Sequence, residues 1–117
     1  MEKTSVIVTH WAMNGMRSEV MRKCIISLVE TAPKAEIIVI DNGGNTEDSR
    51  FLLEQTEQSK IACYIRNRKN MHFGYARNQG LAMVSGEYIV IMDNDIFLQP
   101  TWLEKCIRIL KTFPEKK

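Results

Sequence analysis

Two aspartates separated by one residue follow an apolar run near the end of the chain. The stretch is GEYIVIMDNDIF, in which Asp93 and Asp95 come directly after residues 88–92. Carboxylates at this spacing can share one divalent ion, or one can hold the ion while the other binds a sugar hydroxyl. Mg²⁺ and Mn²⁺ prefer oxygen ligands and keep water or phosphate oxygens in the rest of their shell. The pair is therefore a candidate site for a metal-bound diphosphate.

This motif does not decide the function alone, because a short D-x-D occurs often by chance. Aspartates are also common at strand ends, where they form turns, and Asp41 in IDNGG has that interpretation too. His10 and Trp11 fit packing or loop roles equally well, and His72 has no second histidine or cysteine at ligand spacing. The functional interpretation therefore rests on the combination of these segments.

The order of elements follows from apolar runs and helical periodicity. Continuous apolar runs predict buried strands at residues 5–9, 36–40, 61–65 and 88–92. Apolar residues at helical spacing predict helices over residues 16–31, 46–57 and 75–84, and a fourth after Pro100. Asn45 is expected to cap the second helix and Gly86 to stop the third. Continuous rather than alternating apolar strands are typical of a parallel sheet covered on both faces.

The chain is accordingly predicted to be one α/β domain over residues 1–117, an αβα sandwich with a mainly parallel sheet. Ligands of such sheets bind outside the carboxyl ends of the strands. Asp41 follows the second strand, Asp93 and Asp95 follow the fourth, and the basic loop RNRKN follows the third. We expect these side chains to lie together at one edge of the sheet.

Composition limits the class of protein. The 117 residues are 44% hydrophobic and 26% charged, and the formal net charge of +2 is too small to indicate a nucleic-acid partner. The glycine-rich loops of P-loop NTPases and standard dinucleotide-binding folds are absent. A D-x-D phosphatase would carry its motif on the first strand, not the fourth. The three cysteines match no zinc pattern and are expected to be buried thiols of a reducing compartment. A cytoplasmic location is expected, with at most peripheral contact at the inner membrane face.

Together, four segments resemble the nucleotide-binding half of a family 2 glycosyltransferase, which has the Rossmann-like GT-A fold. They are SVIVTHW, EIIVIDNGGNTEDS, NMHFGYARNQGLAMVSGEYIVIMDND and LQPTWLEKCI. The third is the most specific, because it contains N-x-x-x-G-x-A-R-N-x-G, then G-E-Y-I, then D-x-D. The resemblance spans nearly the whole chain.

The resemblance implies a role for each matching position around the nucleotide. The backbone of Thr9 would lie against the base, and Asp41 would accept a hydrogen bond from that base, typically uracil. Arg77 and Asn78 would line the nucleotide site. Gly74 would let the chain pass close to the ligand.

The resemblance also implies roles for the acidic pair. Asp93 would contact the ribose or support the metal shell, and Asp95 would bind Mn²⁺ or Mg²⁺ together with the diphosphate. The chain departs from the family pattern at His10-Trp11, where Tyr-Asn is frequent, and at Gly44, which replaces a serine. These departures leave the sugar of the donor open.

The implied activity is transfer of a sugar from a nucleotide-diphosphate donor, typically a UDP-sugar, to a hydroxyl acceptor on a saccharide, lipid or protein. Complete family members are much longer, and no catalytic base is found here, so the base and the acceptor-binding half are expected outside this chain. The alternative is a non-catalytic or truncated nucleotide-sugar-binding module. A sheet edge left open for further strands would favour a homo-oligomer.

Overall fold

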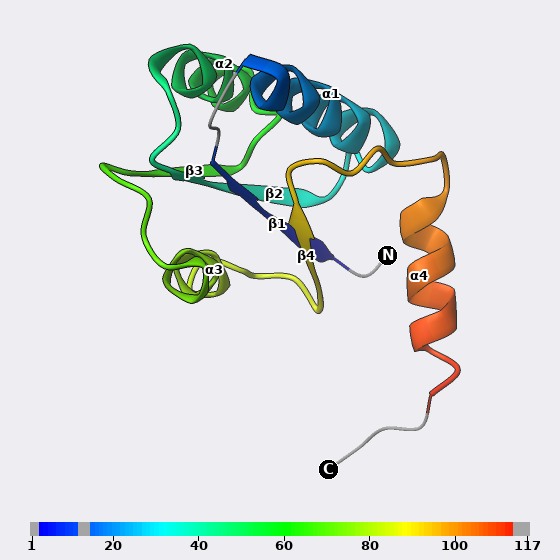
Figure 1. Ribbon diagram of the computed structural model, residues 1–117. Helices are drawn as coiled ribbons and strands as arrows, with labels where there is room; N and C mark the ends of the chain where they lie inside the picture. Colours follow the sequence, from blue (N-terminus) through cyan, green and yellow to red (C-terminus); the bar gives the residue numbers. More distant parts are fainter. Residues whose placement is uncertain (1–2, 12–14, 114–117) are drawn as a thin grey trace.

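The computed structural model describes residues 3–11 and 15–113. In these residues strands and helices alternate along the chain (Figure 1). The strands are β1 (Thr4–His10), β2 (Glu36–Asn42), β3 (Cys63–Asn67) and β4 (Tyr88–Asp93). The helices are α1 (Gly15–Thr31), α2 (Thr46–Glu57), α3 (Phe73–Leu81) and α4 (Trp102–Leu110). The predicted α/β class is confirmed.

All neighbouring strands pair in parallel, in the order β3-β2-β1-β4. Helices α1 and α2 cover one face of this sheet and α3 covers the other (Figure 1). The central residues 6–8 of β1 and 37–40 of β2 are at most 2% exposed, because helices cover both faces of these strands. The αβα sandwich with a parallel sheet is therefore confirmed.

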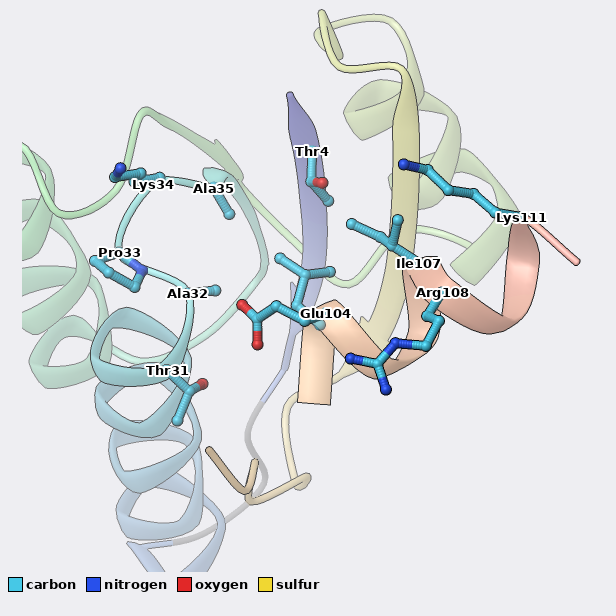
Figure 2. A pocket seen from close by; sticks show the side chains of 11 residues that line it. Thr4, Thr31, Ala32, Pro33, Lys34, Ala35, Glu104, Ile107, Arg108 and Lys111 are labelled. Carbon is cyan, nitrogen blue, oxygen red and sulfur yellow. The ribbon is translucent and has the colours of Figure 1, made fainter. Parts of the chain in front are cut away.

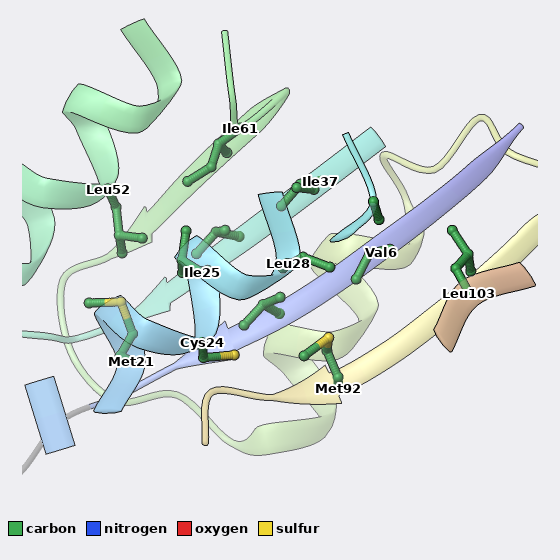
Figure 3. Close-up of a cluster of buried hydrophobic side chains, with 13 residues drawn as sticks. Val6, Met21, Cys24, Ile25, Leu28, Ile37, Leu52, Ile61, Met92 and Leu103 are labelled. Carbon is green, nitrogen blue, oxygen red and sulfur yellow. The ribbon is translucent and has the colours of Figure 1, made fainter. Parts of the chain in front are cut away.

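The main core lies between the sheet and helix α1. Met21, Cys24, Ile25 and Leu28 recur at helical spacing along α1, and all four are 0% exposed. Figure 3 shows them directed toward β1 and β2, with Leu52 of α2 beside them. Burying one large aliphatic side chain contributes about 1.5–3 kcal/mol, so this interface holds α1 firmly against the sheet. A smaller cluster of Ile7, Ile38, Ile40 and Ala76 joins the opposite face to α3.

The third strand lies two residues later than predicted. Ile61, expected inside the strand, precedes it and is 1% exposed in the main core. The Ala62 N–H donates to the Ile37 carbonyl at 2.8 Å, and the turn before it places Ser59 in the left-handed region at φ 63. An apolar residue near a strand can thus fill the core without joining the strand.

Helix α3 also differs from its predicted limits, since it starts at Phe73 and ends at Leu81. His72, expected in a loop, caps it by accepting the Gly74 N–H through Nδ1 at 3.0 Å. Gly86 does not end this helix. It lies against β1, where a Cβ atom would stand 2.7 Å from the Ser5 nitrogen, so the position requires glycine for close approach.

Helix α4 starts at Trp102, beyond Pro100, and packs on the core through few side chains. Leu103 is buried, and the Trp102 indole N–H donates to the Thr31 hydroxyl at 2.8 Å. Cys106 of this helix is exposed, so the prediction of buried thiols is wrong there, whereas it holds for Cys24. Among the described residues, no helix combines the length and apolar character needed to cross a membrane.

Strand β4 forms one edge of the described sheet. Its Ile89 and Ile91 are 44% and 45% exposed, because α3 does not extend across them. An exposed apolar edge strand of this kind is available for pairing with further strands.

Glu36 ties together the amino ends of β1 and β2 and the turn before β4. Its carboxylate accepts hydrogen bonds from the Ser5 hydroxyl at 2.7 Å and from the backbone N–H and hydroxyl of Ser85 at 3.0 and 2.9 Å. The ammonium of Lys3 lies 3.7 Å away. The Ser5 hydroxyl, helped by the Ser85 donors and Lys3, lowers the pKa of Glu36 from its ordinary value of 4.5.

We expect Glu36→Gln to lower the free energy of unfolding at neutral pH by about 1 kcal/mol, the net contribution of a typical hydrogen bond, because this carboxylate is partly exposed to solvent. Because the pKa of Glu36 is lowered in the folded state, its contribution is present above pH 4.5 and is lost as the pH falls through the folded-state pKa. Denaturant unfolding over a pH series measures this difference. Glu87→Gln, at an exposed position, is the matched control. An undiminished difference at low pH would contradict the assignment.

Candidate functional site

A cavity of about 350 Å³ opens at the carboxyl edge of β1, β2 and β4. Its walls come from both ends of the sequence, because parallel pairing brings those strand ends to one edge. The lining residues are Thr9, Trp11, Arg17, Asn42, Asn70, Phe73, Asp93, Asn94 and Asp95. Three of the predicted site residues, Thr9, Asp93 and Asp95, are among them.

Asp93 and Asp95 present two carboxylates to this cavity. Asp93 lies beside Thr9 in the register of β1 and β4. Both aspartates are exposed, and among the described residues neither carboxylate makes a hydrogen bond or an ion pair. The Thr9 hydroxyl is buried and has no hydrogen-bond partner in the described structure. Buried polar groups are almost always paired, so this hydroxyl indicates a place for a ligand or water.

The described residues contain no group of three or more histidine, cysteine, aspartate or glutamate side chains that could enclose a metal ion. The Asp93 and Asp95 carboxylates can supply one or two oxygen ligands. Mg²⁺ is commonly held in this way, with waters and substrate phosphates completing its shell. The donor set therefore fits a divalent ion that is bound together with a phosphorylated ligand.

Asp41 is not brought to the cavity, although the sequence places it at the same edge. Its carboxylate is 0% exposed. One oxygen accepts the Gly44 N–H at 2.9 Å, and the other accepts the hydroxyls of Ser49 at 2.7 Å and Tyr64 at 2.6 Å. The carboxylate is enclosed among these donors and does not line the cavity, so its predicted contact with a nucleotide base does not fit this geometry. The carboxylate instead ties β2 to α2 and β3.

The other predicted residues lie on α3, outside the cavity lining. Gly74 donates its N–H to His72, and both Arg77 and Asn78 are exposed on the helix surface. The Arg77 guanidinium lies 5.9 Å from the centre of the Phe73 ring. Phe73 lines the cavity and Arg77 does not, so the described contact of Arg77 with the cavity wall is through the Phe73 ring.

Asn42 is a site residue that the sequence analysis did not identify. Its amide donates to the Asn70 side chain and the Met71 carbonyl, both at 2.9 Å, and its oxygen accepts from Asn67 at 3.1 Å and from the Met71 N–H at 2.9 Å. These bonds hold the loop after β3 against the cavity. The sequence signal for this residue was the glycine that follows it. Gly43 has φ +84, and a Cβ atom there would stand 2.6 Å from the Asn70 nitrogen, so only glycine lets the chain pass this close to the loop after β3.

Two aromatic rings, Trp11 and Phe73, also line the cavity. The Arg17 guanidinium stacks 5.5 Å from the centre of the Trp11 ring and brings a positive charge to the same wall. Sequence reasoning could not choose between packing and function for Trp11. Its place depends on how α1 returns over the end of β1.

A second cavity, of about 540 Å³, lies between α4 and the turn from α1 to β2 (Figure 2). It contacts β1 at Thr4, at the opposite end of the strand from Thr9. Figure 2 shows the charged groups of Glu104, Arg108 and Lys111 spread apart rather than converging. This second cavity lies at the amino ends of the strands, whereas ligands of such sheets bind at the carboxyl ends. We therefore do not assign the function to it.

Tyr64 provides a measurable signature of the buried Asp41 cluster. Burial of its ring and the hydrogen bond that it donates to Asp41 raise the pKa of Tyr64 from 10.0 to about 12. The bond therefore contributes fully to stability below pH 10.0 and is lost as the pH rises through about 12.

In an ultraviolet titration of phenolate absorbance, we expect one of the three tyrosines to ionise near pH 12. Tyr64→Phe should remove this component, whereas Tyr75→Phe, at a position 51% exposed, should retain it. Circular dichroism at each pH checks that the protein remains folded. A late component that persists in Tyr64→Phe would contradict the assignment.

Comparisons with known proteins identify the family and the fold of this chain. The profile described as "Glycosyl transferase family 2" matches residues 5–115. An uncharacterized glycosyltransferase of Haemophilus influenzae is 34% identical over 82 residues, which are 70% of this chain and 25% of that protein. Glycosyltransferase GlyA of Streptococcus pneumoniae is 29% identical over 104 residues, covering 88% of this chain and 14% of that protein.

Among solved structures, the mannosyltransferase PcManGT from Pyrobaculum calidifontis, in complex with GDP-Man and Mn²⁺, matches with a TM-score of 0.76. The match covers 92% of this chain and 32% of that one at 18% identity, so it establishes the GT-A fold alone. The chain spans only 25% and 14% of the length of the two curated relatives above. Because the family profile matches residues 5–115, the chain belongs to glycosyl transferase family 2.

Proposed function

We propose that this chain is the donor-binding part of a glycosyltransferase, and that the cavity at the carboxyl edge holds a nucleotide-diphosphate sugar. The observation that carries the proposal is the pair of unpaired carboxylates, Asp93 and Asp95, beside the unpartnered Thr9 hydroxyl. Family membership supports the reaction class. The fold neighbour solved with GDP-Man and Mn²⁺ supports a nucleotide sugar and a divalent ion as ligands.

In this proposal Asp95 is a ligand of Mn²⁺ or Mg²⁺, and Asp93 binds the ribose or supports the metal shell. When bound, the ion neutralises negative charge that develops on the departing diphosphate. Arg17 adds a positive charge to the same cavity wall. The two carboxylates need no protein partner because the ligand and its ion provide one.

The nucleotide base is placed against the aromatic wall. Trp11 and Phe73 offer ring faces, and stacking of a base on an aromatic side chain contributes about 1–3 kcal/mol. The buried Thr9 hydroxyl would gain a partner from a ligand or water in this cavity, and we propose that the backbone of Thr9 lies against the base. Uracil is the base that we propose from the family resemblance, and guanine is the alternative, since PcManGT was solved with GDP-Man.

Proton abstraction from a hydroxyl acceptor needs a general base, which we assign to structure outside this cavity. Asp93 and Asp95 are the only carboxylates in its described lining, and both are assigned to the donor. Asp41 and Asp48 are buried and hydrogen-bonded. A module that binds the donor without transferring the sugar is the second candidate, favoured by the same absence of a base in the described lining.

The outer edge of β4, with exposed Ile89 and Ile91, is where further strands or a second copy of this chain would pair. Homo-oligomerisation through this edge remains a prediction. A cytoplasmic location with peripheral contact at the inner membrane face also remains a prediction.

Calorimetric titration of UDP with and without Mn²⁺ tests the proposed function. We expect Mn²⁺ to raise UDP affinity roughly tenfold or more, and Asp95→Ala to abolish this gain, because the ion then loses its main protein ligand. Glu57→Ala removes an exposed carboxylate on α2 and is the matched control.

The proposed metal site fails if Mn²⁺ does not change UDP binding, or if Asp95→Ala binds the Mn²⁺–UDP pair as tightly as the parent protein. Tighter binding of GDP than of UDP would change only the assignment of the base. Binding of a UDP-sugar that stays intact when hydroxyl acceptors are present would favour the second candidate.

A further inference from the structure

The middle residue of the Asp93-Asn94-Asp95 motif points away from the flanking pair. Asn94 is 6% exposed, whereas both aspartates are exposed. Its amide nitrogen lies 3.2 Å from the Trp11 backbone carbonyl and 2.9 Å from Nδ1 of His10. The loop after β4 is thus fastened to the end of β1 by one side chain.

These two contacts determine the tautomer of His10. A backbone carbonyl only accepts, so the Asn94 group beside Trp11 must be the donating NH₂. The His10 Nδ1 facing the same NH₂ must then accept, which leaves the ring proton on Nε2. This Nε2–H donates to the Asp48 carboxylate at 2.9 Å. His10 is therefore a neutral bridge with one accepting and one donating nitrogen.

The anchor beneath His10 is buried and hydrogen-bonded. His10 and Asp48 are both 0% exposed. Asp48 also accepts the Ser18 hydroxyl at 2.9 Å, and its backbone N–H donates to the capping side chain of Asn45 at 2.8 Å. The bridge therefore connects the Asp93-Asn94-Asp95 loop to the first turns of α1 and α2.

The His10 ring also lies close to Gly44, the other position at which the chain departs from the family pattern. A Cβ atom on Gly44 would stand 3.1 Å from both Cδ2 and Nε2 of the His10 ring, and 2.5 Å from the Asp41 carboxylate. The ring thus occupies space that a serine side chain at position 44 would enter. Glycine at position 44 thus leaves room for both the Asp41 carboxylate and the His10 ring.

We propose that His10 is a positioning residue that holds Asp93 and Asp95 toward the donor through Asn94. This inference rests on the proposed function, because it concerns the same two carboxylates. Fixing the middle side chain inward leaves both flanking side chains directed into the cavity. Residues that orient metal ligands are worth about 10- to 100-fold in affinity, and with only two protein carboxylates in the described site their orientation is decisive.

Two amide substitutions at position 10 each keep one of the two hydrogen bonds of His10, the one with Asn94 or the one with Asp48. In His10→Asn the amide oxygen can take the place of Nδ1 and accept from Asn94, but nothing reaches Asp48. In His10→Gln the longer amide reaches Asp48 but offers no acceptor at the Nδ1 position. Both variants lose one buried bond, so a purely structural role predicts similar losses of thermal stability and of Mn²⁺–UDP affinity for the two.

We expect His10→Gln to weaken Mn²⁺–UDP binding by about 10- to 100-fold in calorimetry, and His10→Asn to recover most of that loss. Asn94→Ala removes the same hydrogen bond between Asn94 and His10 from the loop side. It should match His10→Gln in binding, with a smaller change in melting temperature. This third variant keeps the test decisive if a His10 variant does not fold. Equal weakening in both His10 variants, or unchanged binding in Asn94→Ala, would overturn the proposal.

Nitrogen NMR of the metal-free protein provides a measurement that does not depend on the proposed function. We expect His10 to show a protonated Nε2 and an unprotonated Nδ1, and His10→Gln to broaden the backbone amide signals of Asp93 and Asp95 more than His10→Asn does. The opposite tautomer, or unchanged amide signals, would overturn the positioning role. If the parent protein does not bind Mn²⁺–UDP while the NMR results hold, the proposed function fails, but the positioning of the loop by the Asn94–His10 hydrogen bond is still supported.

Discussion

Parallel pairing of β1 with both β2 and β4 is the constraint on which the rest of this structure depends. It sets His10 beside Asp41 and Thr9 beside Asp93, so that residues more than 80 positions apart in sequence become neighbours. Burial of β1 and β2 under helices on both faces stabilises this arrangement, because the apolar side chains of each strand pack in the main core on one face and in the smaller cluster on the other. The carboxyl edge then gathers the polar side chains of every strand end.

At that edge, residues of the same type have opposite roles. Asp41 and Asp48 are fully buried, and their carboxylates accept from hydroxyls, a backbone N–H and the His10 ring. Asp93 and Asp95 are exposed at the cavity without protein donors in the described structure. The hydrogen-bonded carboxylates hold elements together, and the pair without protein donors is the one that we propose as a ligand-binding group. Burial and hydrogen bonding, rather than residue type, separate scaffold from site.

Much of the fold could be predicted from local patterns. The limits of α2 and its Asn45 cap follow from side chains that act within one turn, and the four apolar runs predicted four strands in the right order. Ile61 was misassigned because burial in a core and burial in a strand leave the same apolar signal. Gly86 was misassigned because close approach to β1, not helix termination, requires its missing side chain.

By itself the sequence determined the α/β class, the family resemblance and the acidic pair that ends β4. These depend on short spacings, which survive without any knowledge of packing. Only the tertiary structure decided that Asp41 is enclosed, that Asn42 and Trp11 belong to the cavity, and that His10 reaches Asn94. The physical reason is that hydrogen-bond saturation and exposure depend on partners distant in sequence, which the chain brings together only by folding.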